Sequence, residues 1–132
     1  MAGFGLILAL TPCVGYANTD GEEDRIVITP INATDFEVLQ GTNFGAAEYW
    51  CGAATYIERR LGRSETTPIY VKKPQGPSVN LPGRKGVVFT TLSAGLPQAR
   101  GGLTLSVGEA GVMRKSAAAR RYCRDAFTRS TK

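Results

Sequence analysis

The chain has 132 residues, of which 42% are hydrophobic and 20% are charged, and its formal net charge is +5. It contains no histidine, which excludes the usual Ser-His-Asp and Cys-His catalytic arrangements and histidine-ligated zinc. The charge is uneven: residues 18–48 carry seven acids and one base, whereas residues 49–132 carry four acids and fifteen bases. This asymmetry indicates either an anionic partner or an acidic segment that lies across the basic part of the same fold.

The first 17 residues have the pattern of a secretory signal peptide. They carry no charged side chain, contain an apolar run from Phe4 to Leu10, and end in Gly15-Tyr16-Ala17. The run is much shorter than the roughly 20 apolar residues that a membrane span needs. Because no Lys or Arg precedes it, a buried N-terminal strand or helix is the alternative. We expect a signal peptide over residues 1–17, one domain over residues 18–132, and a periplasmic or secreted location.

Two cysteines, Cys51 and Cys123, remain outside the predicted signal peptide. An even number of cysteines in an exported chain indicates a disulfide. A bridge that closes a loop of about 70 residues stabilises a domain by roughly 4 kcal/mol in the chain-entropy model. Two unlinked buried thiols are the alternative. Since a bridge leaves no thiolate and the chain has no histidine, we expect neither a metal site nor a cofactor.

The clearest helix pattern covers residues 43–61. Thr42 or Asn43 can cap its start, and Gly62 can supply a left-handed stop. The apolar positions at helical spacing are Ala46, Trp50, Ala53, Ala54, Ile57 and Leu61. Cys51 lies beside this stripe, so we expect it near the core.

Alternating apolar and polar residues predict several short strands. They cover residues 25–29, 35–40, 67–72, 87–92, 103–107 and 112–114. Residues 87–92 contain no charge, which predicts a central strand. Residues 74–86 contain three prolines and three glycines, so we expect an irregular loop there.

A second helix is predicted over residues 116–128, with Ser116 as its cap. Its apolar side consists of Ala119, Tyr122, Cys123, Ala126 and Phe127. Cys123 can meet Cys51 if the two helices pack side by side on the sheet. We therefore expect an α+β fold: an antiparallel or mixed sheet of about four to six strands, two helices packed on one face, and one disulfide.

Five segments between residues 35 and 92 also carry a resemblance. They are Phe36-Glu-Val38, Tyr49-Trp-Cys-Gly-Ala-Ala54, Ile69-Tyr-Val71, Gly76-Pro-Ser78 and Pro82-Gly-Arg-Lys-Gly-Val-Val-Phe-Thr90. In spacing and residue type this set resembles a group of small exported proteins of alphaproteobacteria. The resemblance implies export from a Gram-negative cell. The group has no assigned activity, so the resemblance implies nothing about chemistry.

Arg84 and Lys85 form the first candidate binding site. They lie between Gly83 and Gly86, where the basic pair and backbone N–H groups can hold an anion. The alternative is turn chemistry with a solvated basic pair. The glycine pattern is not that of a P-loop, because the loop leads into a strand rather than a helix.

Tyr49 and Tyr56 form the second candidate. They are seven residues apart on one flank of the first helix, so we expect partial exposure and stacking on a sugar or ring. Ordinary core packing is the alternative, and it is the expected role of the neighbouring Trp50.

A third candidate is the basic side of the second helix, formed by Arg120, Arg121 and Arg124. It can contact lipid head groups or an acidic partner, or it can be a solvated face paired with the acidic N-terminal third. Aromatic residues are sparse around it, so we expect no nucleic-acid partner.

Three carboxylates, Glu37, Glu48 and Glu58, are the only acid–base candidates, and nothing in the sequence brings two of them together. We therefore name no catalytic residue, which weighs against an enzyme. We expect an exported, non-enzymatic binding or interaction protein of the cell envelope, without a transmembrane segment in the mature chain. Its partner would be an anionic envelope component or a protein. The alternatives are a small carboxylate-dependent hydrolase or transferase, and a secreted enzyme inhibitor that inserts the loop of residues 74–86.

Overall fold

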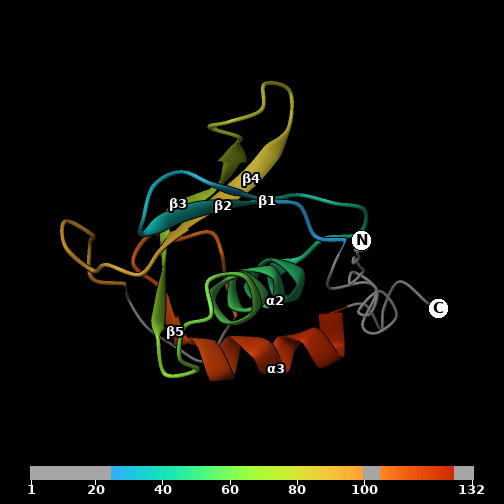
Figure 1. The fold of residues 1–132 in the computed structure, drawn as a ribbon. Coiled ribbons are helices and arrows are strands. Elements are labelled where there is room, and N and C mark those ends of the chain that lie inside the picture. Colours follow the sequence, from blue (N-terminus) through green and yellow to red (C-terminus); the bar gives the residue numbers. More distant parts are fainter. Residues whose placement is uncertain (1–24, 100–104, 127–132) are drawn as a thin grey trace, which may run out of the picture.

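The computed structural model of the protein describes residues 25–99 and 105–126. In chain order its elements are β1 (Ile28–Pro30), β2 (Asp35–Leu39), α2 (Ala46–Thr55), the π-helix η3 (Tyr56–Arg60), β3 (Pro68–Pro77), β4 (Lys85–Thr90), β5 (Met113–Lys115) and α3 (Ser116–Ala126). Figure 1 shows their arrangement. The predicted signal peptide over residues 1–17 lies outside the described residues.

The strands form one antiparallel sheet in the order β1-β2-β4-β3-β5. β4 lies at the centre, which confirms the position predicted from its uncharged sequence. Within the described residues, five antiparallel strands, two helices on one side of the sheet and one disulfide confirm the expected α+β class.

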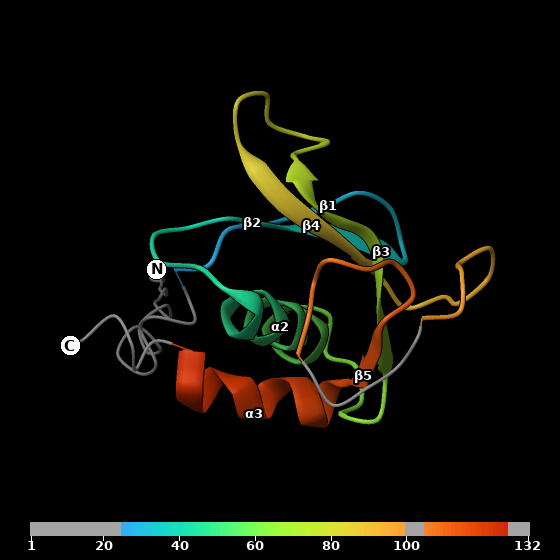
Figure 2. The same ribbon diagram turned by 180° about the vertical axis from the view of Figure 1, so that it is seen from behind.

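The two helices lie in successive layers. α2 lies between the sheet and α3, as both ribbon views show (Figures 1 and 2). α3 therefore packs on α2 rather than beside it on the sheet. The bond between Cys51 of α2 and Cys123 of α3, with 4.7 Å between their Cα atoms, joins these layers and confirms the predicted pairing. Because α2 has neighbours on both sides, all residues from 47 to 57 are buried.

An aromatic cluster fills the space between the sheet and α2. The ring of Phe36 stacks on Tyr56 at 4.4 Å and on Phe89 at 5.9 Å, and Trp50 meets Phe89 at 5.0 Å. The indole Nε1 of Trp50 donates a hydrogen bond to the carbonyl of Ser106 at 3.0 Å. Trp50 is thus a core residue, as expected.

The start of α2 differs from the prediction. The helix begins at Ala46, and Glu48 rather than Thr42 or Asn43 satisfies its first turn: its Oε1 accepts a hydrogen bond from the N–H of Gly45 at 2.8 Å. Asn43 stands outside the helix in a left-handed conformation, with φ of 59°. The predicted left-handed stop at Gly62 is confirmed, with φ of 65°.

The prolines and glycines of residues 74–86 do not exclude regular structure, contrary to the prediction. β3 continues to Pro77 and β4 begins at Lys85. Two shifts in the β3–β4 register, between Val71 and Lys73 and between Lys73 and Gly76, accommodate these residues in a bent strand.

Two other strand predictions also need correction. β1 begins at Ile28, later than predicted. Residues 105–107 form no strand, although the carbonyl of Val107 accepts a hydrogen bond from the N–H of Gln75 at 3.0 Å. The remaining two residues of that predicted strand, 103 and 104, lie outside the described residues.

Candidate functional site: the hairpin tip and the basic pocket

The connection between β3 and β4 is the most prominent projection of the fold. We call residues 78–84 the hairpin tip. The bend in β3 carries it to the side of the sheet away from α2 and α3, where it rises clear of the body in both ribbon views (Figures 1 and 2). Lys73 braces this bend, since its Nζ donates a hydrogen bond to the carbonyl of Pro77 at 2.9 Å.

The hairpin tip has a hydrogen-bonded shape of its own. The N–H of Ser78 donates to the carbonyl of Arg84 at 2.8 Å, which closes its base. The hydroxyl oxygen of Ser78 accepts from the N–H groups of Asn80 and Leu81, at 3.1 and 2.9 Å. Gly83, with φ of 82°, supplies the left-handed turn that returns the chain to β4.

A buried carboxylate fastens the hairpin tip to the sheet. Glu37 of β2 is 0% exposed. Its Oε1 accepts a hydrogen bond from the hydroxyl of Ser78 at 2.8 Å, and its Oε2 accepts one from the N–H of Val79 at 3.0 Å. A third bond, from Nδ2 of Asn80 to Oγ1 of Thr29 at 2.8 Å, ties the tip to β1. The tip therefore covers the outer face of β2.

Gly86 makes room for this carboxylate. A Cβ built on Gly86 would lie 2.8 Å from Oε2 of Glu37, closer than side-chain carbons approach oxygen atoms. The β4 backbone and the hairpin tip thus enclose the charge together. The sequence signal for this arrangement is weak: a single acid, Glu37, among the apolar residues of the strand predicted over residues 35–40.

The hairpin tip presents apolar side chains to solvent. Val79 is 49% exposed and Leu81 is 39% exposed. No acidic residue occurs between Glu65 and Glu109, so the whole β3–β4 hairpin is basic or neutral. The tip projects from the sheet with two exposed aliphatic side chains and one basic residue, Arg84.

The structure separates the predicted basic pair. Arg84 lines a cavity of about 390 Å³ at the base of the hairpin tip, whereas Lys85 does not line it. We call this cavity the basic pocket. It is lined by Arg25, Ile26, Val27, Leu39, Gln40, Gly41, Thr42, Asn43, Phe44 and Arg84. The sequence missed Arg25, because it lies about 60 residues from Arg84 and no local pattern connects the two.

The expected exposure of the tyrosines is wrong. Tyr49 is 0% exposed and Tyr56 is 8% exposed, because α3 and the sheet cover α2 from both sides. Burial raises the pKa of Tyr49; the hydrogen bond that Gln75 donates to its hydroxyl opposes this rise, and the charge of Glu37 adds to it. Neither tyrosine lines the basic pocket, the cavity beside β3 and β5, or the small cavity around Asp35.

Arg120 of α3 contributes to the packing of that helix on the rest of the fold. Arg120 forms an ion pair with Glu58 of η3, with Nη1 and Oε1 3.1 Å apart. Glu58 also accepts a hydrogen bond from the hydroxyl of Ser116, the first residue of α3, at 2.6 Å. These contacts hold the start of α3 against η3, which continues α2. The acids at positions 20–24, part of the acidic third expected to pair with this basic side, lie outside the described residues.

The three acid–base candidates belong to different parts of the fold. Glu37 holds the hairpin tip, Glu48 caps the start of α2, and Glu58 docks α3. Each carboxylate therefore accepts hydrogen bonds with an evident structural purpose. No contact given above joins two of them into an acid–base pair.

A further carboxylate, Asp35, lies on the same face of β2 as Glu37. Lys72 of β3 approaches it, with 2.5 Å between Nζ and Oδ2. Burial alone would raise the pKa of Asp35, but hydrogen bonds from Lys72, Thr90, Thr34 and Asn32 together outweigh burial and lower that pKa to about 2. Asp35 therefore stays charged under ordinary conditions.

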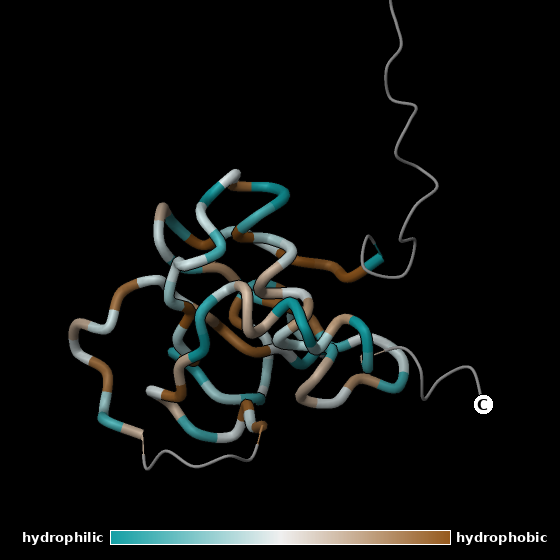
Figure 3. The backbone as a smooth tube through the Cα atoms, turned by 90° about the horizontal axis from the view of Figure 1, so that it is seen from below, coloured by the Kyte–Doolittle hydropathy of each residue, from teal (hydrophilic) through white to brown (hydrophobic). Residues whose placement is uncertain are grey.

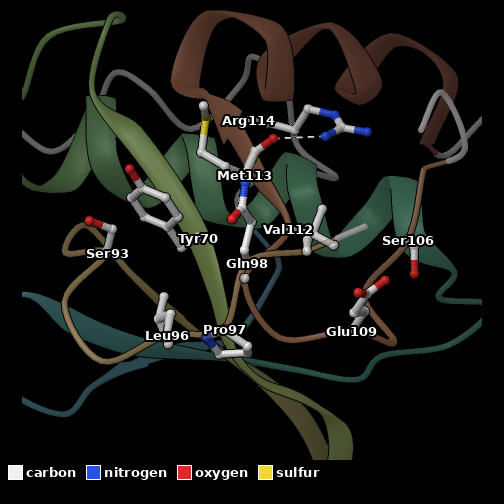
Figure 4. A pocket seen from close by; sticks show the side chains of 12 residues that line it. Tyr70, Ser93, Leu96, Pro97, Gln98, Ser106, Glu109, Val112, Met113 and Arg114 are labelled. Carbon is white, nitrogen blue, oxygen red and sulfur yellow. Dashed lines mark hydrogen bonds between the residues drawn. The ribbon is translucent and has the colours of Figure 1, made fainter. Parts of the chain in front are cut away.

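Another cavity, of about 680 Å³, lies beside β3 and β5 (Figure 4). Its side chains include Tyr70, Glu109 and Arg114, so charges of both signs line it. Arg114 is turned toward its own chain, where Nη1 donates to the carbonyl of Met113 at 2.7 Å. This mixture favours no single class of ligand.

The described residues also bear on membranes and metals. Coloured by hydropathy, the chain alternates between short apolar and polar stretches (Figure 3), and none of the helices within residues 25–99 and 105–126 has the length and apolar character that a membrane span requires. The same residues contain no group of three or more acid or cysteine side chains placed to hold a metal ion.

Comparisons with known proteins give no further guide. No protein-family model, curated protein or solved structure matches this chain. The proposals below therefore depend on the geometry and chemistry of the chain itself.

Proposed function

We propose that the protein is an exported binding protein of the cell envelope that recognises a partner protein with its hairpin tip. One observation carries the proposal: a fully buried carboxylate, Glu37, is committed to holding a solvent-exposed loop. Burial of a charged group is costly unless it is hydrogen-bonded. The hydrogen bonds of Glu37 go to Ser78 and Val79 of the hairpin tip, which contributes little to the core. Their effect is therefore to fix the shape of the tip.

A fixed loop is suited to recognition. Ordering side chains and loops on association costs free energy, and a loop that is already rigid avoids much of this cost. Val79 and Leu81 supply the apolar contact that the centre of a protein interface needs. An exposed aliphatic pair on a rigid projection is otherwise unfavourable in water.

The chemistry of the hairpin tip defines the partner. A convex apolar tip fits a concave apolar cleft. Arg84, Lys85 and Lys73 around the tip favour an acidic rim on that cleft. The active-site cleft of an enzyme has this shape, so inhibition of an enzyme is the specific form of this function that the projecting tip favours.

The disulfide supports the proposed location. Disulfides form and persist in oxidising compartments such as the periplasm and the extracellular space. The bond between Cys51 and Cys123 is therefore compatible with the signal peptide proposed for residues 1–17.

Site-specific crosslinking tests the proposal. A photo-crosslinking amino acid replaces Leu81 in one variant and Leu92 in a matched control, since Leu92 is 53% exposed and lies outside the hairpin tip. We expect an adduct with one partner protein from position 81 and none from position 92, in cells that produce and export the chain. Absence of an adduct from position 81, or equal adducts from both positions, would contradict the proposal.

Affinity for the captured partner then tests the apolar contact. We expect the double variant Val79→Ser, Leu81→Ser to weaken binding by roughly a hundredfold, because two buried anchors each contribute about 1–2 kcal/mol. Leu92→Ser should change affinity less than twofold. If the partner is an enzyme, the double variant should relieve its inhibition to the same extent.

A further inference from the structure

We infer that the basic pocket binds a small molecule in which one anionic head group is joined to an apolar body. The basic pocket lies at the base of the hairpin, and only Arg84 belongs to both surfaces. The inference does not depend on the proposed function.

Two arginines give the basic pocket its charge. Arg25 belongs to the segment before β1, and Arg84 belongs to the hairpin, where its Nη2 donates a hydrogen bond to the carbonyl of Gln40 at 3.4 Å. Neither arginine forms an ion pair with a described residue, and none of the described residues that line the pocket is acidic. Two arginines at one cavity, neither of them ion-paired with a described residue, attract an anion, and guanidinium groups match the geometry of carboxylates and phosphates.

Apolar residues also line the basic pocket. Ile26, Leu39 and Phe44 line it, together with the half-exposed Val27. Phe44 is fixed there, because its ring meets the buried Tyr49 edge-on at 5.3 Å. A cavity lined by two arginines together with aromatic and aliphatic residues matches an amphiphilic anion better than a free inorganic ion.

The rim of the basic pocket has a specific backbone shape. A Cβ on Gly41 would lie 2.8 Å from Cε1 of Phe44, so a side chain at that position would displace the Phe44 ring. Asn43 adopts φ of 59°, a left-handed conformation that asparagine adopts more readily than most other non-glycine residues. This turn leads directly into Phe44, which lines the cavity.

A matched pair of dyes tests this inference. 8-Anilino-1-naphthalenesulfonate joins a sulfonate to an aromatic body, and N-phenyl-1-naphthylamine is its neutral analogue. We expect saturable fluorescence with the anionic dye at one site, and at least tenfold weaker binding of the neutral dye. Arg25→Gln and Arg84→Gln should each weaken the anionic dye about tenfold, as the loss of a charge-assisted contact predicts.

Lys85→Gln is the matched control, because it removes the same charge one residue from Arg84 but outside the basic pocket. It should change dye affinity less than twofold. Arg25→Gln should also leave crosslinking at position 81 unchanged, which distinguishes failure of this inference from failure of the proposed function. An unchanged melting temperature in each variant excludes a folding effect. Equal losses for Lys85→Gln and Arg84→Gln, or equal binding of the two dyes, would overturn the inference.

Competition identifies the head group. Octanoate and octyl phosphate carry the same chain on a carboxylate or a phosphate, and the one that displaces the dye at lower concentration identifies the head group. Octanol and inorganic phosphate lack one half of the amphiphile, and both should displace the dye at least tenfold less effectively. Displacement by octanol as readily as by octanoate would contradict an anion site, and displacement by inorganic phosphate alone would contradict an amphiphile site.

Discussion

The outer face of β2 carries two carboxylates, Asp35 and Glu37, where an ordinary covered sheet face carries apolar side chains. Each is matched by polar groups from the β3–β4 hairpin: the ammonium of Lys72 for Asp35, and the hydroxyl of Ser78 with the N–H of Val79 for Glu37. The hairpin is thus attached to β2 by charges and hydrogen bonds as well as by backbone pairing. Single substitutions at these two acids should therefore affect the hairpin more than the core.

Asp35 should make stability depend on pH in the acid range. Its pKa in the folded protein is about 2, below the ordinary value of 3.8, so folding favours its charged form. A lowered pKa stabilises the fold above about pH 4, and this contribution is lost as the pH falls toward 2. We expect Asp35→Asn to lower the free energy of unfolding by about 2 kcal/mol at pH 6. Urea unfolding should show that this difference shrinks below pH 4, and a difference independent of pH would contradict the prediction.

Glu37 should control the order of the hairpin tip. Glu37→Leu replaces the carboxylate with an apolar group of similar size. It leaves the hydroxyl of Ser78 and the N–H of Val79 without their acceptor. Because a hydrogen bond to a charged group contributes about 1.5–3 kcal/mol, amide hydrogens of the tip should exchange roughly tenfold to a hundredfold faster. Exchange in α2, measured in the same experiment, serves as the internal reference. Equal protection of the tip in both proteins would show that Glu37 does not hold it.

At the level of elements, α2 has two buried faces: the sheet covers one, and α3 covers the other. The disulfide joins α3 to α2. The contacts of Glu58 with Ser116 and Arg120 join α3 to η3, which continues α2. Without the covalent link, α3 would be retained by packing and by polar contacts alone.

Removal of the disulfide should therefore be strongly destabilising. The bridge joins residues 72 positions apart. Closing a loop of that length is worth about 4 kcal/mol in the chain-entropy model. The double variant Cys51→Ala, Cys123→Ala should unfold at a correspondingly lower urea concentration, and a reductant should destabilise the original chain but not the variant. Equal sensitivity of both proteins to reductant would contradict this account.

For the molecule as a whole, local sequence patterns predicted the elements whose formation depends on residues near one another in the chain. Alternation located β2, uncharged strand-forming residues located β4, helical spacing located α2, and the two cysteines outside the predicted signal peptide predicted their own pairing. Each of these signals lies within a few residues or follows from a residue count. The α+β class was accessible for the same reason.

What the sequence concealed depends on layers and on long-range contacts. Tyr49 and Tyr56 lie off the main apolar stripe, and contacts far along the chain accompany their burial: Phe36 of β2 stacks on Tyr56, and Gln75 of β3 donates a hydrogen bond to Tyr49. Glu37 alternates with apolar residues as a solvent-facing acid would, and only the bend of β3 places a loop over it. Arg25 and Arg84 meet at one cavity because β1, β2 and β4 are neighbours in the sheet.

The burial of α2 on all sides has a consequence for how the sequence can diverge. Between Ala47 and Ile57 no residue is free of neighbours, and even a Cβ on Gly52 would lie 2.9 Å from a methyl group of Ile26. Substitutions there are constrained by volume, whereas Val79 to Arg84 can change without disturbing the core. Distant relatives should therefore be recognisable by the buried helix, and the hairpin tip should differ among them according to the partner that each one meets.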